Sequence, residues 1–144
     1  AILMQKGQKS RLFHKQLLPT GDVFDEARFI EPGDLRKNYF KLGKKKFFLT
    51  ICEDIWAWPN EKGESLYDLN PLKKVPLEKV DMVLNLSASP WHVGKEKLRA
   101  HMTSQTAKRF KAPLLYANLV GAQDEIIFDG ASFIVSPQGK TLLT

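Results

Sequence analysis

The most constraining feature of this sequence is an almost uninterrupted apolar run at residues 47–52, FFLTIC. A strand that is covered on one face alternates apolar and polar residues, whereas a strand that is buried on both faces is apolar nearly throughout. The run is far too short to span a membrane, and it follows a turn-forming segment at residues 43–46, GKKK. We therefore predict a central strand in a sheet that is covered on both faces.

The other segments alternate between strand-like and helix-like patterns. The opening residues Ala1–Met4 are apolar without any preceding turn, which predicts the inside of a buried strand. Alternation of buried strands and helices indicates an α/β layered fold, and a closing hairpin around residues 137–139 favours a mixed sheet. The further strands that the pattern predicts lie at residues 1–6, 11–14, 39–42, 82–86, 114–118, 128–135 and from 141 onward.

Two helices and two long loops complete the prediction. We expect helices at residues 77–80 and 94–111, and loops at residues 19–34 and 57–75, the second on the surface. The residues available for the buried face of the longer helix are Leu98, Met102, Ala107 and Phe110.

Composition excludes several classes of protein. A chain of 144 residues with 43% hydrophobic and 26% charged residues is typical of one globular domain with a core. The sequence has neither a membrane-spanning run nor a signal peptide, and its single cysteine excludes an internal disulfide, so we expect a cytoplasmic location and no membrane partner. The net charge is +6, but the densest basic run, at residues 44–46, lies in a predicted turn and no nucleic-acid motif accompanies it. We therefore expect no nucleic-acid partner.

The position of Cys52 makes it the first candidate for chemistry. It ends the central strand, and in open α/β sheets functional groups gather beyond the carboxyl ends of strands. The alternative is that it is a buried small hydrophobe, as most free cysteines are. Lys15 also follows a strand and could lower the pKa of a thiol or hold an oxyanion, although it could equally be a surface lysine. Glu26 could orient Lys15, or it could cap a turn.

Four stretches of the chain resemble a known family. They are residues 15–31, KQLLPTGDVFDEARFIE; residues 51–56, ICEDIW; residues 85–95, NLSASPWHVGK; and residues 118–132, NLVGAQDEIIFDGAS. The placement of the lysine and the cysteine resembles the nitrilase, or carbon–nitrogen hydrolase, superfamily. The VFDE run, SASP followed by GK, and DE followed by FDG are similar in particular to the glutaminase domain of glutamine-dependent NAD synthetases.

This resemblance implies a fold and an activity. Residues 1–144 are expected to form part of an α-β-β-α sandwich, as a glutaminase domain that lacks its N-terminal portion. The implied activity is hydrolysis of L-glutamine through a cysteine thioester, which releases ammonia for ATP-dependent amidation of deamido-NAD by a separate synthetase domain. ATP and magnesium are expected only in that domain, because residues 1–144 hold no SGG-type phosphate loop, and no cofactor or metal is expected here. A homo-oligomer is also expected.

The resemblance also assigns roles to residues. The nucleophile would be Cys52, Lys15 and the backbone N–H that follows Cys52 would hold the oxyanion, and Glu26 would keep Lys15 in place. The residues expected to line the glutamine pocket are Gly21, Phe24, Glu53, Ser89 and Lys95. Lys95 suits the α-carboxylate of the substrate, although it could also be a solvated lysine at a helix start.

The sequence departs from the family pattern in three places. The family has a general-base glutamate upstream of the lysine loop, which residues 1–144 do not contain, so we expect this segment alone to be inactive. Gly21 stands where the family carries a tyrosine that contacts glutamine, so another aromatic residue such as Phe24 or Trp56 would have to serve, or binding is altered. The loop at residues 57–75 is longer than usual. Two alternatives stay open: a free-standing hydrolase acting on another amide or nitrile, and a non-catalytic domain that keeps the fold.

Overall fold

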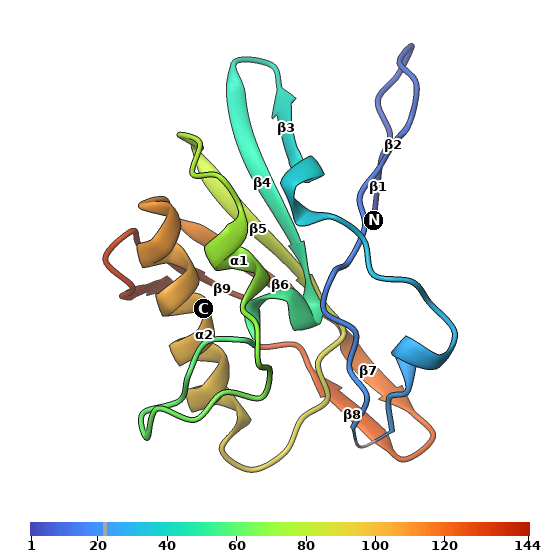
Figure 1. The fold of residues 1–144 in the computed structure, drawn as a ribbon, viewed down its shortest axis with the longest axis vertical. Helices are drawn as coiled ribbons and strands as arrows, with labels where there is room; N and C mark the ends of the chain where they lie inside the picture. The colour runs from blue at the N-terminus through green and yellow to red at the C-terminus, as the bar shows by residue number, and fades with distance from the viewer. Residues whose placement is uncertain (22) are drawn as a thin grey trace.

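A six-stranded mixed sheet forms the centre of the molecule in the computed structural model, which describes residues 1–21 and 23–144 (Figure 1). The strand order is β10-β9-β6-β5-β4-β3, with β4, β5 and β6 parallel and the outer strands antiparallel. The strands are β3 (Tyr39–Leu42), β4 (Lys45–Ile51), β5 (Met82–Ser87), β6 (Leu114–Asn118), β9 (Phe133–Val135) and β10 (Thr141–Leu143). The predicted α/β class and the mixed sheet are confirmed.

The central strand β4 is covered on both faces, as the apolar run predicts. Phe48 faces the main core and packs on Phe110 with ring centroids 4.6 Å apart, while Leu49 joins a second cluster with Phe13 and Phe40 on the opposite face. Each successive side chain of a strand points to the other face, so a strand between two apolar layers needs apolar residues at almost every position.

The helices α1 (Pro71–Lys74) and α2 (Lys95–Phe110) and the 3₁₀ turn η3 (Cys52–Ile55) contribute to the main core on one side of the sheet (Figure 1). Two other 3₁₀ turns, η1 (Glu26–Arg28) and η2 (Leu35–Lys37), interrupt the segment between β2 and β3. Within the described residues, no helix combines the length and apolar character needed to cross a membrane.

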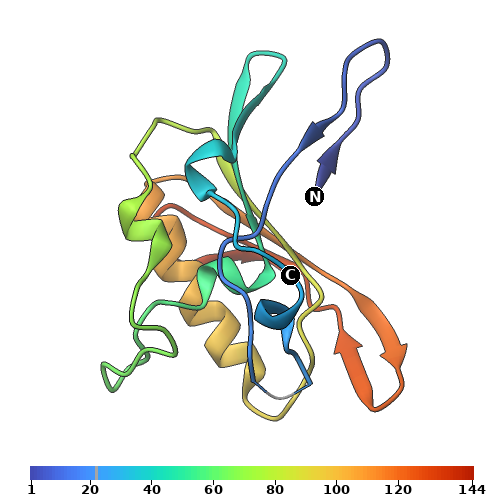
Figure 2. The same ribbon diagram turned by 45° about the vertical axis from the view of Figure 1, so that its right-hand side comes forward.

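Two short hairpins extend away from the sheet, as Figures 1 and 2 show. They pair β1 (Ile2–Leu3) with β2 (Arg11–Leu12) and β7 (Val120–Gln123) with β8 (Ile126–Asp129). The prediction that Ala1–Met4 is the inside of a buried strand is wrong, because Ile2 and Met4 are exposed in this hairpin. The single strand predicted at residues 128–135 is also wrong: Gly130 and Ala131 have φ angles of 67° and 48°, which break it into β8 and β9.

The helix predicted at residues 77–80 is absent, and the helix α1 forms earlier, within the predicted loop. Asn70 accepts a hydrogen bond from the Leu72 N–H at 3.0 Å, and Pro71 occupies the first helical position, so the local sequence starts a helix here. Residues 57–75 are also not purely a surface loop, because Trp58 is buried and donates its Nε1–H to Thr106 Oγ1 at 2.8 Å.

Of the four residues predicted for the buried face of α2, only Leu98 is exposed, while Arg99, Thr103 and Thr106 are buried in addition. Leu98 is 38% exposed, whereas its neighbour Arg99 is 1% exposed and lies in the buried stripe with Met102, Ala107 and Phe110. Arginine occupies an apolar face only when its guanidinium is paired, and here Asp129 supplies the partner.

The stacking of Phe48 on Phe110 gives the first prediction. Truncating the fully buried Phe48 to Ala removes this stacking and leaves a cavity between β4 and α2, so we expect a loss of about 3–5 kcal/mol of unfolding free energy. Denaturant unfolding of the full-length protein, with Leu42→Ala on the exposed end of β3 as control, measures it. A Phe48→Ala variant as stable as Leu42→Ala would contradict this packing.

Candidate active site

A cavity of about 750 Å³ lies beyond the carboxyl ends of the parallel strands β4 and β5. Segments that are far apart in the sequence converge there, as expected for a functional site in a parallel sheet. Every residue that the sequence predicted for the site lines this cavity: Lys15, Gly21, Phe24, Glu26, Cys52, Glu53, Ser89 and Lys95. Their grouping is a structural finding, while their individual roles stay predictions.

Cys52 sits where the strand β4 turns sharply into η3. Its φ angle is 44°, in the left-handed region that residues with a side chain rarely adopt. Such backbone strain persists only where the surrounding structure holds it, and it concentrates at functional sites. The turn places the half-buried thiol at the cavity wall.

The group that holds this turn is the carboxylate of Asp54, which is fully buried. Its Oδ2 accepts from the Ile51 N–H at 2.8 Å, and its Oδ1 accepts from the N–H groups of Gln16 and Leu17 at 2.8 and 3.0 Å. Burial raises the pKa of Asp54 to about 6, and these three backbone hydrogen bonds oppose the shift. Asp54 therefore fastens the Cys52 turn directly to the Lys15 segment.

The Lys15 segment is fixed by other backbone contacts as well. The Gly33 N–H donates to the Lys15 carbonyl at 2.7 Å, and the buried Asn38 donates its Nδ2–H to the His14 carbonyl at 2.9 Å. Gly33 is required by this approach, since a Cβ there would lie 2.2 Å from the His14 Cβ. The main chain that carries the lysine is thus held on both sides.

The side chain of Lys15 is paired with Glu26. Its Nζ lies 2.6 Å from Glu26 Oε2, and the two side chains are only 14% and 27% exposed. A partly shielded ion pair of this kind fixes a flexible lysine more firmly than a surface pair does. The geometry therefore fits the predicted use of Glu26 to orient Lys15.

The environment of Cys52 sets the state of its thiol. Burial raises the pKa of Cys52, and the charge of Glu53 raises it further. Lys15 lowers the pKa, as do hydrogen bonds to the sulfur from the Ser87 side chain and the Ala88 backbone. Burial is the largest effect, so the thiol is protonated at neutral pH and needs a proton acceptor to become a nucleophile.

A second group of charged and aromatic side chains lines the same cavity. The hydroxyl of Tyr67 donates to Glu53 Oε1 at 2.6 Å, and the ammonium of Lys95 lies 4.1 Å from the centroid of the Trp56 ring. Phe24 and Trp56, the two aromatic residues that could take the place of the tyrosine missing at Gly21, both line the cavity. Tyr67 was not among the residues predicted from the sequence. The sequence feature that could have pointed to it is its place as the single tyrosine of residues 57–75, the loop that is longer than in the family pattern.

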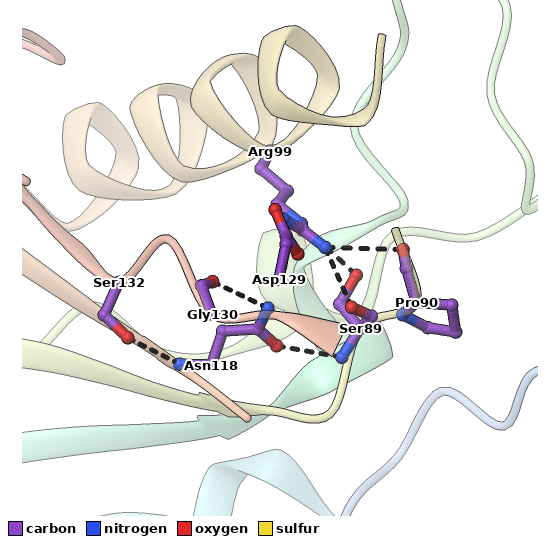
Figure 3. A network of polar contacts seen from close by, with 7 residues as sticks. All are labelled: Ser89, Pro90, Arg99, Asn118, Asp129, Gly130 and Ser132. Carbon is purple, nitrogen blue, oxygen red and sulfur yellow. Dashed lines mark hydrogen bonds and ion pairs between the residues drawn. The ribbon is translucent and has the colours of Figure 1, made fainter. Parts of the chain in front are cut away.

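Ser89 is held by the buried guanidinium of Arg99 (Figure 3). Arg99 Nη1 lies 2.8 Å from both carboxylate oxygens of Asp129, while Nη2 donates to the carbonyls of Ser89 and Pro90 at 2.8 and 3.3 Å. Asn118 completes the network: its Oδ1 accepts from the Ser89 N–H at 2.9 Å and its Nδ2 donates to the Gly130 carbonyl at 2.8 Å. These contacts join the third and fourth matching stretches to Arg99 of α2, at the part of the cavity lining that carries Ser89.

Removing Arg99 tests this network. Arg99→Met leaves the Asp129 carboxylate and two carbonyls without their donor, so we expect a loss of about 3–5 kcal/mol in unfolding free energy. Arg99→Lys should rescue only part of the loss, because the single nitrogen of lysine cannot bind the Asp129 carboxylate through one nitrogen and the Ser89 and Pro90 carbonyls through another, as arginine does. Arg36→Met, which removes an exposed ion pair with Asp34, serves as the control. Equal unfolding midpoints for Arg99→Met and Arg36→Met in the full-length protein would contradict the role given to Arg99.

The cavity offers a thiol, an oriented ammonium and carboxylates as its reactive groups. No cluster of three or more His, Cys, Asp or Glu side chains suited to a metal ion occurs among residues 1–21 and 23–144.

Known proteins match this chain over almost its whole length. A glutamine-dependent NAD(+) synthetase of Synechocystis sp. is 46% identical over 142 residues, which cover 99% of this chain and 25% of that protein. The corresponding enzyme of Thermotoga maritima is 39% identical, with 99% and 23% covered. The solved structure of glutamine-dependent NAD+ synthetase from Acinetobacter baumannii superposes with a TM-score of 0.77 and 36% identity, over 99% of this chain and 25% of that one.

The chain thus spans about a quarter of the length of the curated relatives that it matches. The family model described as carbon-nitrogen hydrolase matches residues 1–144. The strand-end thiol, the paired lysine and the mixed sheet agree with that match, and this chain belongs to the carbon–nitrogen hydrolase family.

Proposed function

We propose that this chain is the glutamine-hydrolysing domain of a glutamine-dependent NAD synthetase. The observation that carries the proposal is the convergence of Cys52, Lys15 and Glu26 on one cavity, with Lys15 already oriented by its pair with Glu26. The names of the relatives, which match 99% of the chain, support glutamine as the substrate and NAD synthesis as the destination of the ammonia.

The proposed reaction begins at Cys52. Its thiolate attacks the carbon of the side-chain amide and forms a tetrahedral intermediate, whose oxyanion is held by the Lys15 ammonium and the Glu53 backbone N–H. The C–N bond then breaks, ammonia leaves with the transferred proton, and a thioester remains on Cys52. Water attacks the thioester, which releases glutamate and restores the thiol. Each oxyanion donor in such a site is worth about 3–4 kcal/mol.

The proton acceptor is proposed to be a glutamate outside residues 1–144, as the family resemblance implies. Both acidic side chains that were predicted for the site are engaged elsewhere, since Glu26 pairs with Lys15 and Glu53 accepts a hydrogen bond from Tyr67. A third carboxylate would take the Cys52 proton, pass it to the leaving ammonia and activate the hydrolytic water.

The glutamine would lie with its amide at Cys52 and its α-carboxylate toward Lys95. Ser89, whose position is fixed by Arg99 and Asn118, would also contact the substrate. Gly21 and Phe24 would close the pocket from the lysine loop, where the absence of a side chain at Gly21 leaves open space.

The remaining steps belong to the rest of the full-length protein. ATP, magnesium and deamido-NAD would bind a synthetase domain of the same protein, which receives the ammonia, and this segment would need no cofactor. We further propose a homo-oligomer in the cytoplasm.

Replacing the nucleophile separates the two activities. Cys52→Ala in the full-length protein is expected to abolish glutamine hydrolysis and glutamine-dependent NAD synthesis, since no thioester can form. NAD synthesis from added ammonia should stay within about twofold of the wild type, because that step bypasses the glutaminase site.

The matched variant is Cys52→Ser, which replaces the thiol with a hydroxyl of similar size and is also expected to be inactive. Both rates are measured by glutamate release and by NAD formation. Glutamine hydrolysis that survives Cys52→Ala would overturn the mechanism.

The pH dependence of Cys52 alkylation tests the electrostatics. Because burial raises the thiol pKa, the rate of labelling by iodoacetamide should keep rising with pH above the range where free cysteine levels off. Lys15→Met removes the cation that lowers this pKa, so its labelling curve should move to still higher pH. Lys140→Met, in the turn before β10 and outside the cavity lining, is the control. Quantifying the Cys52 peptide by mass spectrometry gives the curves, and superimposable curves for Lys15→Met and the wild type would contradict the coupling.

A further inference from the structure

Glu53 follows the nucleophile directly and is one of the anionic groups at the cavity wall. Its carboxylate is held by Tyr67, which also lines the cavity and whose hydroxyl donates to Oε1 at 2.6 Å. A short hydrogen bond from a neutral donor to a carboxylate is stronger than a bond between neutral groups. The bond therefore fixes the orientation of Glu53 relative to Cys52.

Tyr67 is itself well supported. Its ring is half-buried and packs against the main core, and its N–H donates to Ser65 Oγ at 3.3 Å. Ser65 Oγ in turn bonds the buried Ala57 carbonyl at 3.3 Å, and Asn70 donates to the same carbonyl at 3.1 Å. The loop is thus tied to the residues that follow η3, and it delivers the tyrosine hydroxyl to a defined place.

A positive group stands in the same cavity. The Lys95 ammonium lies over the Trp56 ring, 4.1 Å from its centroid, and both residues line the cavity with Glu53 and Tyr67. A site that presents one carboxylate and one ammonium complements a ligand with one cation and one anion, which is the head group of a free α-amino acid.

We propose that Tyr67 is a positioning residue for substrate recognition: it holds Glu53 so that this carboxylate receives the α-ammonium of the amino-acid substrate. This inference rests on the proposed glutaminase function and adds the group that selects for a free α-amine. A carboxylate has lone pairs for several donors, so Glu53 can accept from Tyr67 and from the substrate together.

The ionisation states agree with this arrangement. Burial and the neighbouring Glu53 charge raise the pKa of Tyr67, so its hydroxyl keeps its proton at neutral pH and acts as a donor. The energetic consequence falls on binding of the α-amine and not on the chemistry at the amide, which lies at the other end of glutamine.

The test is Tyr67→Phe in the full-length protein, which keeps the ring and removes only the hydroxyl. We expect KM for glutamine to rise about tenfold and kcat to change less than about twofold, the pattern of a lost binding contact. With glutaramate, which is glutamine without its α-amino group, Tyr67→Phe should leave kcat/KM within about twofold of the wild type. Tyr39→Phe makes the same chemical change outside the cavity lining and should leave kcat and KM unchanged for both glutamine and glutaramate.

A double variant sharpens the result. Because Tyr67 is proposed to act through Glu53, Glu53→Gln combined with Tyr67→Phe should raise KM no further than Glu53→Gln alone. An equal loss of kcat/KM with glutamine and glutaramate, or additive losses in the double variant, would show general packing and overturn the proposal. So would an unchanged KM for glutamine in Tyr67→Phe. Failure of the underlying function has a different signature, namely glutamine hydrolysis that persists in Cys52→Ala.

Discussion

The site depends on the hydrogen bonds that the buried carboxylate of Asp54 accepts. This carboxylate is fully buried, and it accepts hydrogen bonds from the Ile51 N–H at the end of β4 and from the Gln16 and Leu17 N–H groups next to Lys15. Two segments that share no strand pairing are thereby locked at a fixed separation. The left-handed backbone of Cys52 is held within the same turn, so one buried carboxylate supports the positions of both Cys52 and Lys15.

The segment of the cavity lining that carries Ser89 is held by a second buried charge. Arg99 replaces an apolar residue on the core face of α2 and binds Asp129 together with the Ser89 and Pro90 carbonyls. The cavity lies beyond the carboxyl ends of the parallel strands β4 and β5, and β4 is packed on both faces. The side chains that line the cavity are therefore carried by the carboxyl ends of parallel strands and by loops whose main chains are hydrogen-bonded to buried polar groups. Such support holds side chains in fixed positions, as a preorganised site requires.

The sequence predicted the parts of the fold that have strong periodic patterns. The strand at FFLTIC, the helix ending before Pro113 and the strand at residues 114–118 all rest on long apolar patterns with clear boundaries. It failed where short polar signals decide the outcome. The Asn70–Pro71 pair starts a helix that the loop composition concealed, and the positive φ angles at Gly130 and Ala131 divide an apolar stretch that reads as one strand.

The site was predicted through resemblance, and what was missed is what only three-dimensional contacts reveal. Cys52, Lys15 and Glu26 stand in recognisable stretches, whereas Arg99 reads as one more exposed helical arginine until Asp129 is placed against it. Tyr67 lies in a segment outside the four matching stretches, and only the folded loop brings it to Glu53. The most direct measurement is a structure of the full-length protein treated with a glutamine-mimicking diazo-ketone. We expect a covalent adduct on Cys52 with its carbonyl oxygen within hydrogen-bond distance of Lys15 Nζ. An adduct on another residue, or an oxygen directed away from Lys15, would contradict the assignment of this cavity as the glutaminase site.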